Sequence, residues 1–173
     1  MRYIYFLFGT VFIVFGIYTA GIYLDLYGEL EEPGYSINSE LPKSLVDQKL
    51  ITQEPFGREK QILFGDTHVH TTYSTDAFLW SLPILNGEGP HPIADACDFA
   101  RFCANLDFWV STDHAEALTP RKWKSIKEAV RNCNSPTDAT DPDLVTFLGY
   151  EWTQVGNTAE THYGHKNVMF LDI

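Results

Sequence analysis

Residues 65–77 read GDTHVHTTYSTDA and place two histidines, His68 and His70, a few residues after the apolar run QILF. Such a run has the pattern of a buried strand that ends where the polar residues begin. In an extended chain, residues two apart point to the same side, so both imidazoles can bind one ion. Asp66 is in phase with them as a ligand or as an acceptor for an imidazole N–H, and Asp76 can fold back after a turn. The stretch therefore predicts a metal site at a strand end.

Strands and helices alternate in the pattern that follows. Apolar runs at 106–114, 144–152 and 165–173 each predict a strand. Residues 92–104 have an apolar helical face, and a second helix opens at Thr119, an N-cap residue followed by proline. Alternation of this kind predicts a parallel sheet or a (βα) barrel, in which catalytic groups gather at the C-terminal ends of the strands.

Side chains that can bind a cation stand at three of the predicted strand ends. His68 and His70 follow the first strand, Asp113 and His114 end the second, and Glu151 ends the third. One concave rim is expected to collect them. The two oxygens of Glu151 can bridge two metal ions, which together can hold a hydroxide near neutral pH and stabilise an in-line displacement.

Four segments together resemble the successive motifs of the PHP (polymerase and histidinol phosphatase) superfamily: FGDTHVHTTYSTDA, LDFWVSTDHAE, FLGYEWT and GHKNVMF. They look closest to an uncharacterised, often exported bacterial branch known as a domain of unknown function. The resemblance covers residues 61–173. PHP proteins are distorted (βα)7 barrels that bind up to three metal ions, and many hydrolyse phosphate esters. The resemblance implies an α/β fold, a partial TIM-like (βα)7 barrel of four strands, with two or three divalent ions (Zn, Mn or Fe) in the complete domain.

The resemblance also implies roles for individual residues. His162 is a less suitable substitute for the histidine at the start of the fourth strand, and Asp113 is expected to orient a ligand or to bind metal weakly. The implied catalytic residues are Glu151 and Asp113, and the implied metal ligands are His68, His70, Asp76, His114, Glu151 and His165. The late ligands of the family, a histidine and an Asp-x-His pair, have no counterpart. Residues 61–173 are therefore expected to be an incomplete, N-terminal half of the domain, weakly active or inactive.

The predicted function is a metal-dependent hydrolase of the PHP type, a phosphoesterase that acts on a small-molecule or polymeric anionic ester through a metal-held hydroxide. Two alternatives stay open: an amidohydrolase-like enzyme, which would want a metal-bridging lysine where Glu151 stands, and a non-catalytic metal-binding remnant. The formal net charge is −11, and no basic stripe is visible, which argues against a nucleic-acid partner. The oligomeric state has no signature in the sequence.

The N-terminal segment, residues 1–24, is apolar and carries no charge between Tyr3 and Leu24. Its length predicts a transmembrane helix, and Arg2 before it predicts a domain anchored in the inner membrane and facing the periplasm. A cleaved signal peptide, with a secreted product, is the alternative. Residues 25–60 scatter proline, glycine and charge, which predicts a linker with at most two helical turns at 45–51.

Three cysteines allow one disulfide in an oxidising compartment and leave one thiol over. Cys103 closes the first predicted helix and Cys133 closes the second, at the same level of the expected barrel. The predicted disulfide is therefore Cys103–Cys133, with Cys97 as the free thiol.

Overall fold

The computed structural model describes residues 2–24, 26, 33–53, 62–85, 87, 91–135 and 142–172. Parts of the predicted linker, residues 25, 27–32 and 54–60, lie outside the described residues.

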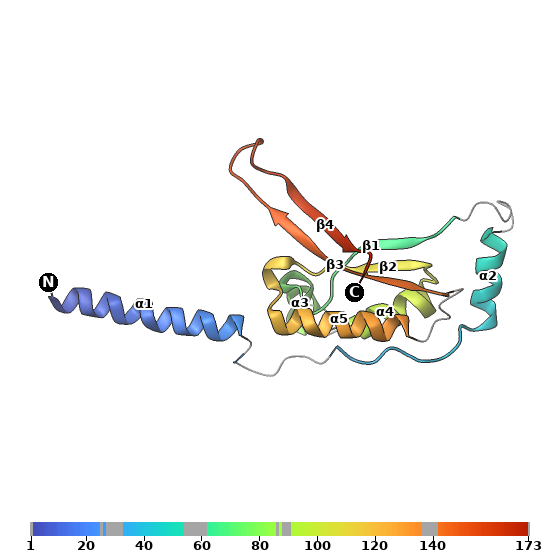
Figure 1. Cartoon of the computed structure of the whole chain (residues 1–173), viewed down its shortest axis with the longest axis horizontal. Helices are drawn as coiled ribbons and strands as arrows, with labels where there is room; N and C mark the ends of the chain where they lie inside the picture. The colour runs from blue at the N-terminus through green and yellow to red at the C-terminus, as the bar shows by residue number, and fades with distance from the viewer. Residues whose placement is uncertain are drawn as a thin grey trace.

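A four-stranded sheet in the order β1-β2-β3-β4 forms the centre of the molecule (Figure 1). Its strands are β1 (Gly65–Val69), β2 (Phe108–Ser111), β3 (Val145–Gln154) and β4 (Gly164–Phe170). The side-chain amide of Asn167 on β4 donates to the Thr67 carbonyl of β1 at 2.6 Å. This bond joins the two outermost strands, so the sheet must be strongly curled.

The direction of β4 corrects the predicted fold class. β1 and β3 both pair with β2 in parallel, but β4 pairs antiparallel with β3 from Leu148↔Phe170 to Gln154↔Gly164. A (βα)7 barrel has parallel strands throughout, so the prediction of a partial parallel barrel is wrong. The connection, residues 155–163, is shorter than the dozen or so residues that a parallel crossover needs. The fold is a mixed α/β arrangement around a curled sheet.

Two helices pack on one face of this sheet. α4 (Ile93–Asp98) continues as the π-helix η3 (Phe99–Cys103), and α5 (Pro120–Asn134) follows β2. The hydroxyl of Thr119 caps α5 by accepting from the Lys122 amide at 3.2 Å, which confirms the predicted helix start. The core between the helices and the sheet includes the fully buried side chains of Ile93, Trp109, Ile126, Val130 and Leu144. Three short elements complete this part of the fold: α3 (Thr75–Ser81), η2 (Pro83–Leu85) and η4 (Ala115–Ala117).

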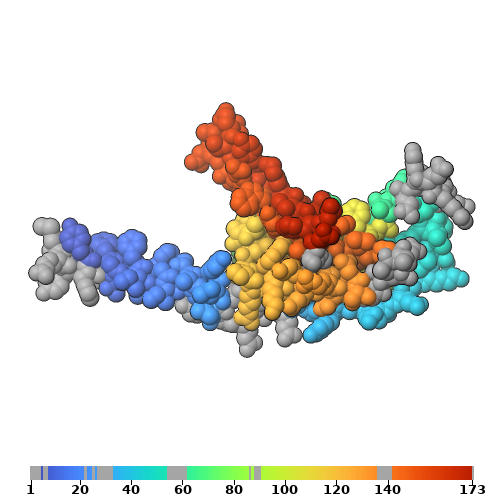
Figure 2. Space-filling model, in the orientation of Figure 1, coloured from blue at the N-terminus to red at the C-terminus, as the bar shows by residue number. Residues whose placement is uncertain are grey.

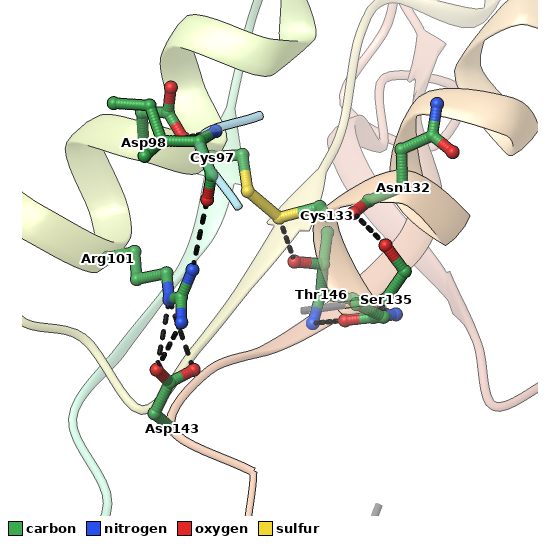
Figure 3. Close-up of a disulfide and its surroundings, with 10 residues drawn as sticks. Cys97, Asp98, Arg101, Asn132, Cys133, Ser135, Asp143 and Thr146 are labelled. Atoms are coloured by element: carbon green, nitrogen blue, oxygen red, sulfur yellow. Dashed lines mark hydrogen bonds and ion pairs between the residues drawn. A yellow bond between two sulfur atoms is a disulfide. The ribbon is translucent and has the colours of Figure 1, made fainter. Parts of the chain in front are cut away.

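A disulfide joins α4 to α5 behind the sheet, and it is not the predicted one. Cys97 and Cys133 are bonded with their Cα atoms 6.1 Å apart, and both are buried (Figure 3). Cys103 is the free thiol and is exposed. The wider turn of η3 rotates Cys103 away from the face that carries Ile93 and Cys97, and nothing in the sequence marks this change of helix type.

The N-terminal helix α1 (Arg2–Tyr23) extends away from the α/β body (Figures 1 and 2). Across the described ranges, no helix combines the length and the apolar character that crossing a bilayer requires. The prediction of a transmembrane helix at 1–24 is therefore wrong.

The described part of the predicted linker packs against the α/β body. It contains α2 (Lys43–Gln53), which is longer than the one or two turns expected. The Lys49 ammonium lies 3.1 Å from the Asp107 carboxylate and donates to the carbonyls of Leu106 and Asp143. These contacts hold α2 at the end of the sheet where β2 and β3 begin, away from the predicted site.

Candidate metal centre

Four imidazoles surround the carboxylate of Glu151, whose side chain is only 2% exposed. Oε1 lies 2.8 Å from His165 Nδ1. Oε2 lies 2.9 Å from His70 Nε2, 3.3 Å from His114 Nδ1 and 3.5 Å from His68 Nε2. The structure thus brings the predicted histidines from the ends of β1 and β2 and from the start of β4 to one acid on β3.

Strand pairing explains why these residues meet. His114 forms an isolated parallel bridge with Glu151, and the Glu151 amide donates to the Asp113 carbonyl at 3.0 Å. On the other side, the antiparallel register pairs His165 with Thr153, two residues beyond Glu151 on the same face. The reversed direction of β4 is therefore what places His165 beside the acid.

The six predicted metal ligands fall into three groups of three: His68, His70 and Glu151; His70, Asp76 and His114; and His114, Glu151 and His165. Within each group the possible ligand atoms lie within 4.8 Å of one another. Nε2 of His68 and Nε2 of His70 are 3.0 Å apart, a spacing that suits two ligands of one ion. Three protein ligands with an open fourth position are typical of catalytic zinc sites.

Ligand sharing limits how these groups can be filled. The second group shares His70 with the first and His114 with the third, and a neutral imidazole has only one free lone pair for a metal. The first and third groups share only Glu151, whose two oxygens can serve two ions. Among the described residues, these two groups can therefore be occupied together with all their side chains.

One atom of Glu151 supports a cation at this position. Oε2 is buried and has no hydrogen-bond partner among the described residues, although three imidazole nitrogens lie within 3.5 Å of it. A buried carboxylate oxygen without a partner costs free energy, on the order of 1–3 kcal/mol or more. Zn²⁺, Mn²⁺ and Fe²⁺ bind imidazole nitrogen and carboxylate oxygen, so this donor set fits such an ion.

Asp76 joins the cluster from the first turn of α3. Its Oδ1 lies 3.4 Å from His70 Nδ1, and its Oδ2 lies 3.2 Å from His114 Nε2. Burial acts to raise the pKa of Asp76, but the Ala77 amide and the two histidines outweigh burial and lower the pKa below its usual value. The ionised carboxylate can therefore bind a cation or orient the two imidazoles.

Asp113, predicted as a catalytic residue, lies behind the cluster and belongs to none of the three groups. It is fully buried, and its oxygens accept hydrogen bonds from the Thr71 amide at 2.7 Å, the Thr71 hydroxyl at 2.9 Å and the Ser74 hydroxyl at 3.0 Å. Burial raises the pKa of Asp113, against the effect of these hydrogen bonds. Its structural effect is to hold the turn between His70 and Asp76.

Thr153 is a site residue that the sequence did not reveal. Its hydroxyl lies 3.4 Å from Nδ1 of both His114 and His165. The available signal was its place two residues after Glu151, on the same face of β3.

The remaining polar residues near the predicted site do not join the groups. Asp66 accepts a hydrogen bond from the His68 amide at 2.9 Å and so supports that histidine through the backbone. His162 lies 3.3 Å from the Gly156 carbonyl in the exposed connection between β3 and β4, and His91 lies 3.8 Å from the Asp95 carboxylate. Both histidines are outside the three groups.

Comparison with known proteins finds one family, described as "Protein of unknown function (DUF3604)", whose profile matches residues 57–120. The matched segment includes His68, His70, Asp76 and His114 but ends before Glu151 and His165. No curated protein and no solved structure matches the chain. The similarity is thus to a family of unknown function, and it carries no statement about activity.

Proposed function

We propose that this chain holds a dinuclear metal centre and belongs to the metal-dependent hydrolases of the PHP type, with a phosphoester as substrate. The observation that supports the proposal most directly is the buried Glu151 carboxylate, with four histidine nitrogens at 2.8–3.5 Å and one oxygen without a hydrogen bond. A structural role for four histidines around one acid would leave that oxygen unexplained.

The residues divide into two ligand sets with Glu151 between them. His68 and His70 would hold one ion with Glu151, and His114 and His165 would hold the other. Divalent ions at such a site lower the pKa of coordinated water and offset the negative charge that develops on a phosphoryl group. Asp76 would fix the orientation of His70 and His114 from the other side.

The contacts favour a phosphoesterase over an amidohydrolase-like enzyme. The second class would want a metal-bridging lysine, and the lysine nearest in sequence to the cluster is Lys166 on β4. Its ammonium donates to the Tyr163 carbonyl at 2.8 Å and lies over the Tyr163 ring, in the exposed hairpin. Glu151 occupies the central place instead, and a carboxylate suits the bridging of two ions.

The buried Cys97–Cys133 disulfide bears on where the protein would work. Structural disulfides persist in oxidising compartments and are rare where glutathione keeps thiols reduced. We therefore propose that the α/β body functions outside the reducing cytosol.

Metal analysis followed by an assay on a generic phosphodiester tests the proposal. Wild-type protein should bind about two ions per chain and hydrolyse the ester when Mn²⁺ or Zn²⁺ is added. His68→Ala/His70→Ala should lose about one ion and nearly all activity. The matched control is His162→Ala, which removes a histidine outside the groups and should change neither quantity. Unchanged metal content in His68→Ala/His70→Ala would contradict the ligand assignment.

A further inference from the structure

A cavity of about 750 Å³ opens beside the metal-ligand candidates, between β1 and the helix formed by α4 and η3. His68 and His70 belong both to its lining and to the first ligand group. Its volume lies in the range of roughly 300–1,000 Å³ that is usual for small-molecule sites. The cavity is therefore large enough for the part of a substrate that is not attacked.

Small side chains create the space. Ala96, Ala100 and Ala104 line the cavity at intervals of four residues, so one side of the helix presents methyl groups where larger residues would fill the volume. The ring of Phe99 stands at the same wall and is 64% exposed, although it is large and apolar. Trp109 also lines the cavity, and its indole N–H has no acceptor among the described residues.

The charge of the lining limits what can enter. Asp66 and Asp95 contribute carboxylates, His91 contributes an imidazole, and no lysine or arginine is among the described residues that line the cavity. A second phosphate or a polyanionic chain would meet the negative charge of these two carboxylates, and no described residue of the lining offsets it. A neutral group with an apolar surface meets no such repulsion and buries the exposed face of Phe99.

We propose that this cavity binds the neutral, aromatic or similarly apolar group of an ester whose phosphoryl end lies at His68 and His70. The inference rests on the proposed function, since it defines the substrate class of the same site. Such a cavity would select phosphoesters with an uncharged apolar substituent over sugar phosphates, nucleotides with further phosphates and polymeric anions.

Binding of two non-hydrolysable probes tests this without relying on turnover. Phenylphosphonate and methylphosphonate carry the same charged group and differ only in the apolar part. On the metal-loaded full chain, titration calorimetry should show phenylphosphonate binding at least about tenfold more tightly, since a buried ring removes apolar surface from water. Phe99→Ala should reduce this preference to about threefold, and Ala104→Leu, which fills the rim of the cavity, should abolish it. The matched control is Cys103→Leu, on the same helix but outside the lining.

The outcomes separate the two proposals. Equal affinity for the two probes, or a preference that neither Phe99→Ala nor Ala104→Leu changes, overturns the apolar site even if metal binding and ester hydrolysis are intact. Tighter binding of a phosphonate with a trimethylammonium group than of phenylphosphonate would also overturn it, in favour of a cationic substituent attracted by Asp66 and Asp95. Failure of the wild-type chain to bind metal would instead contradict the proposed function.

Discussion

The helix-covered face of the sheet and the rim around Glu151, formed by Glu151 and the four histidines beside it, each bury a side chain that can carry charge. The two regions differ in how that side chain is paired. On the helix-covered face, the buried guanidinium of Arg101 meets the Asp143 carboxylate at 2.6 Å, beside the disulfide (Figure 3). At the rim, the buried Glu151 carboxylate meets only imidazoles, and one of its oxygens lacks a hydrogen bond within the described part of the chain. The buried charge of the first region is paired within the protein, whereas the donor atoms of the second fit the proposed metal ions. Changes in the first should affect unfolding, and changes in the second should affect metal binding.

Glu151→Gln should have the largest effect, because it removes the only residue shared by the first and third ligand groups. Replacing one carboxylate oxygen with an amide nitrogen leaves at most one oxygen for two ions, so metal affinity should fall more than about 100-fold. Competition with a metal-sensitive chelator measures this. The metal-free variant should unfold at the same denaturant concentration as metal-free wild type or at a higher one, since a poorly partnered buried charge is gone. Retention of two tightly bound ions would contradict the bridging role.

Removal of the disulfide tests the other region. Cys97→Ala/Cys133→Ala releases a loop with a sequence separation of 36 residues, and the free energy of unfolding should fall by about 3 kcal/mol. Denaturant unfolding followed by circular dichroism measures the loss, and Cys103→Ala is the control because that thiol is free and exposed. Metal content under native conditions should not change. A parallel loss of metal would show that the two regions are coupled.

The two regions also differed in how far the sequence predicted them. The convergence of His68, His70, His114 and Glu151 followed from polar residues at strand ends, because parallel strands end at one edge. The direction of β4 depends on the length of residues 155–163, which is too short for a crossover helix and was a usable signal. The pairing of Cys97 depends on the π-turn of η3, a local choice of helix type that periodicity does not reveal. Thr153 looked like an ordinary strand residue.

Asp113 is buried behind the ligand cluster and holds the turn that carries His70 and Asp76. Its replacement should therefore lower both the free energy of unfolding and the affinity for metal. Asp113→Ala leaves the buried Thr71 amide without an acceptor, and the free energy of unfolding should fall by about 2–3 kcal/mol. The turn that positions His70 and Asp76 should loosen as well, which weakens metal binding. Asp113→Asn keeps an acceptor oxygen and should cost less than about 1 kcal/mol. Equal destabilisation by both variants would mean that the hydrogen bonds to Thr71 contribute little.

A comparison of wild type with Asp113→Asn also tests how the stability of the fold depends on pH. Burial raises the pKa of Asp113, so the folded chain binds this proton more readily than the unfolded chain. The stabilising contribution is fully present below the ordinary carboxyl pKa of about 4 and is lost as the pH rises through the raised value. Metal-free wild type should therefore lose stability relative to Asp113→Asn over that range. A constant difference between the two would contradict the raised pKa.

Thr153→Val should have the smallest effect on metal affinity. It tests whether a hydroxyl beside His114 and His165 contributes to metal binding. Valine keeps the shape and the β-branch but removes the hydroxyl that lies 3.4 Å from both His114 and His165. The hydroxyl faces the same Nδ1 atoms that lie against Glu151, so it borders the proposed ion itself. Polar groups around a metal site typically change affinity by 10–100-fold, and the length of these contacts places the expected loss near the lower end, about tenfold. Thr153→Ser retains the hydroxyl and should bind metal as the wild type does. Thr153 is far along β3 from the region of the disulfide. The metal-free Thr153→Val protein should therefore unfold at the same denaturant concentration as metal-free wild type. A loss of stability without a loss of metal affinity would contradict a role of Thr153 in the metal site and would indicate a role in folding stability.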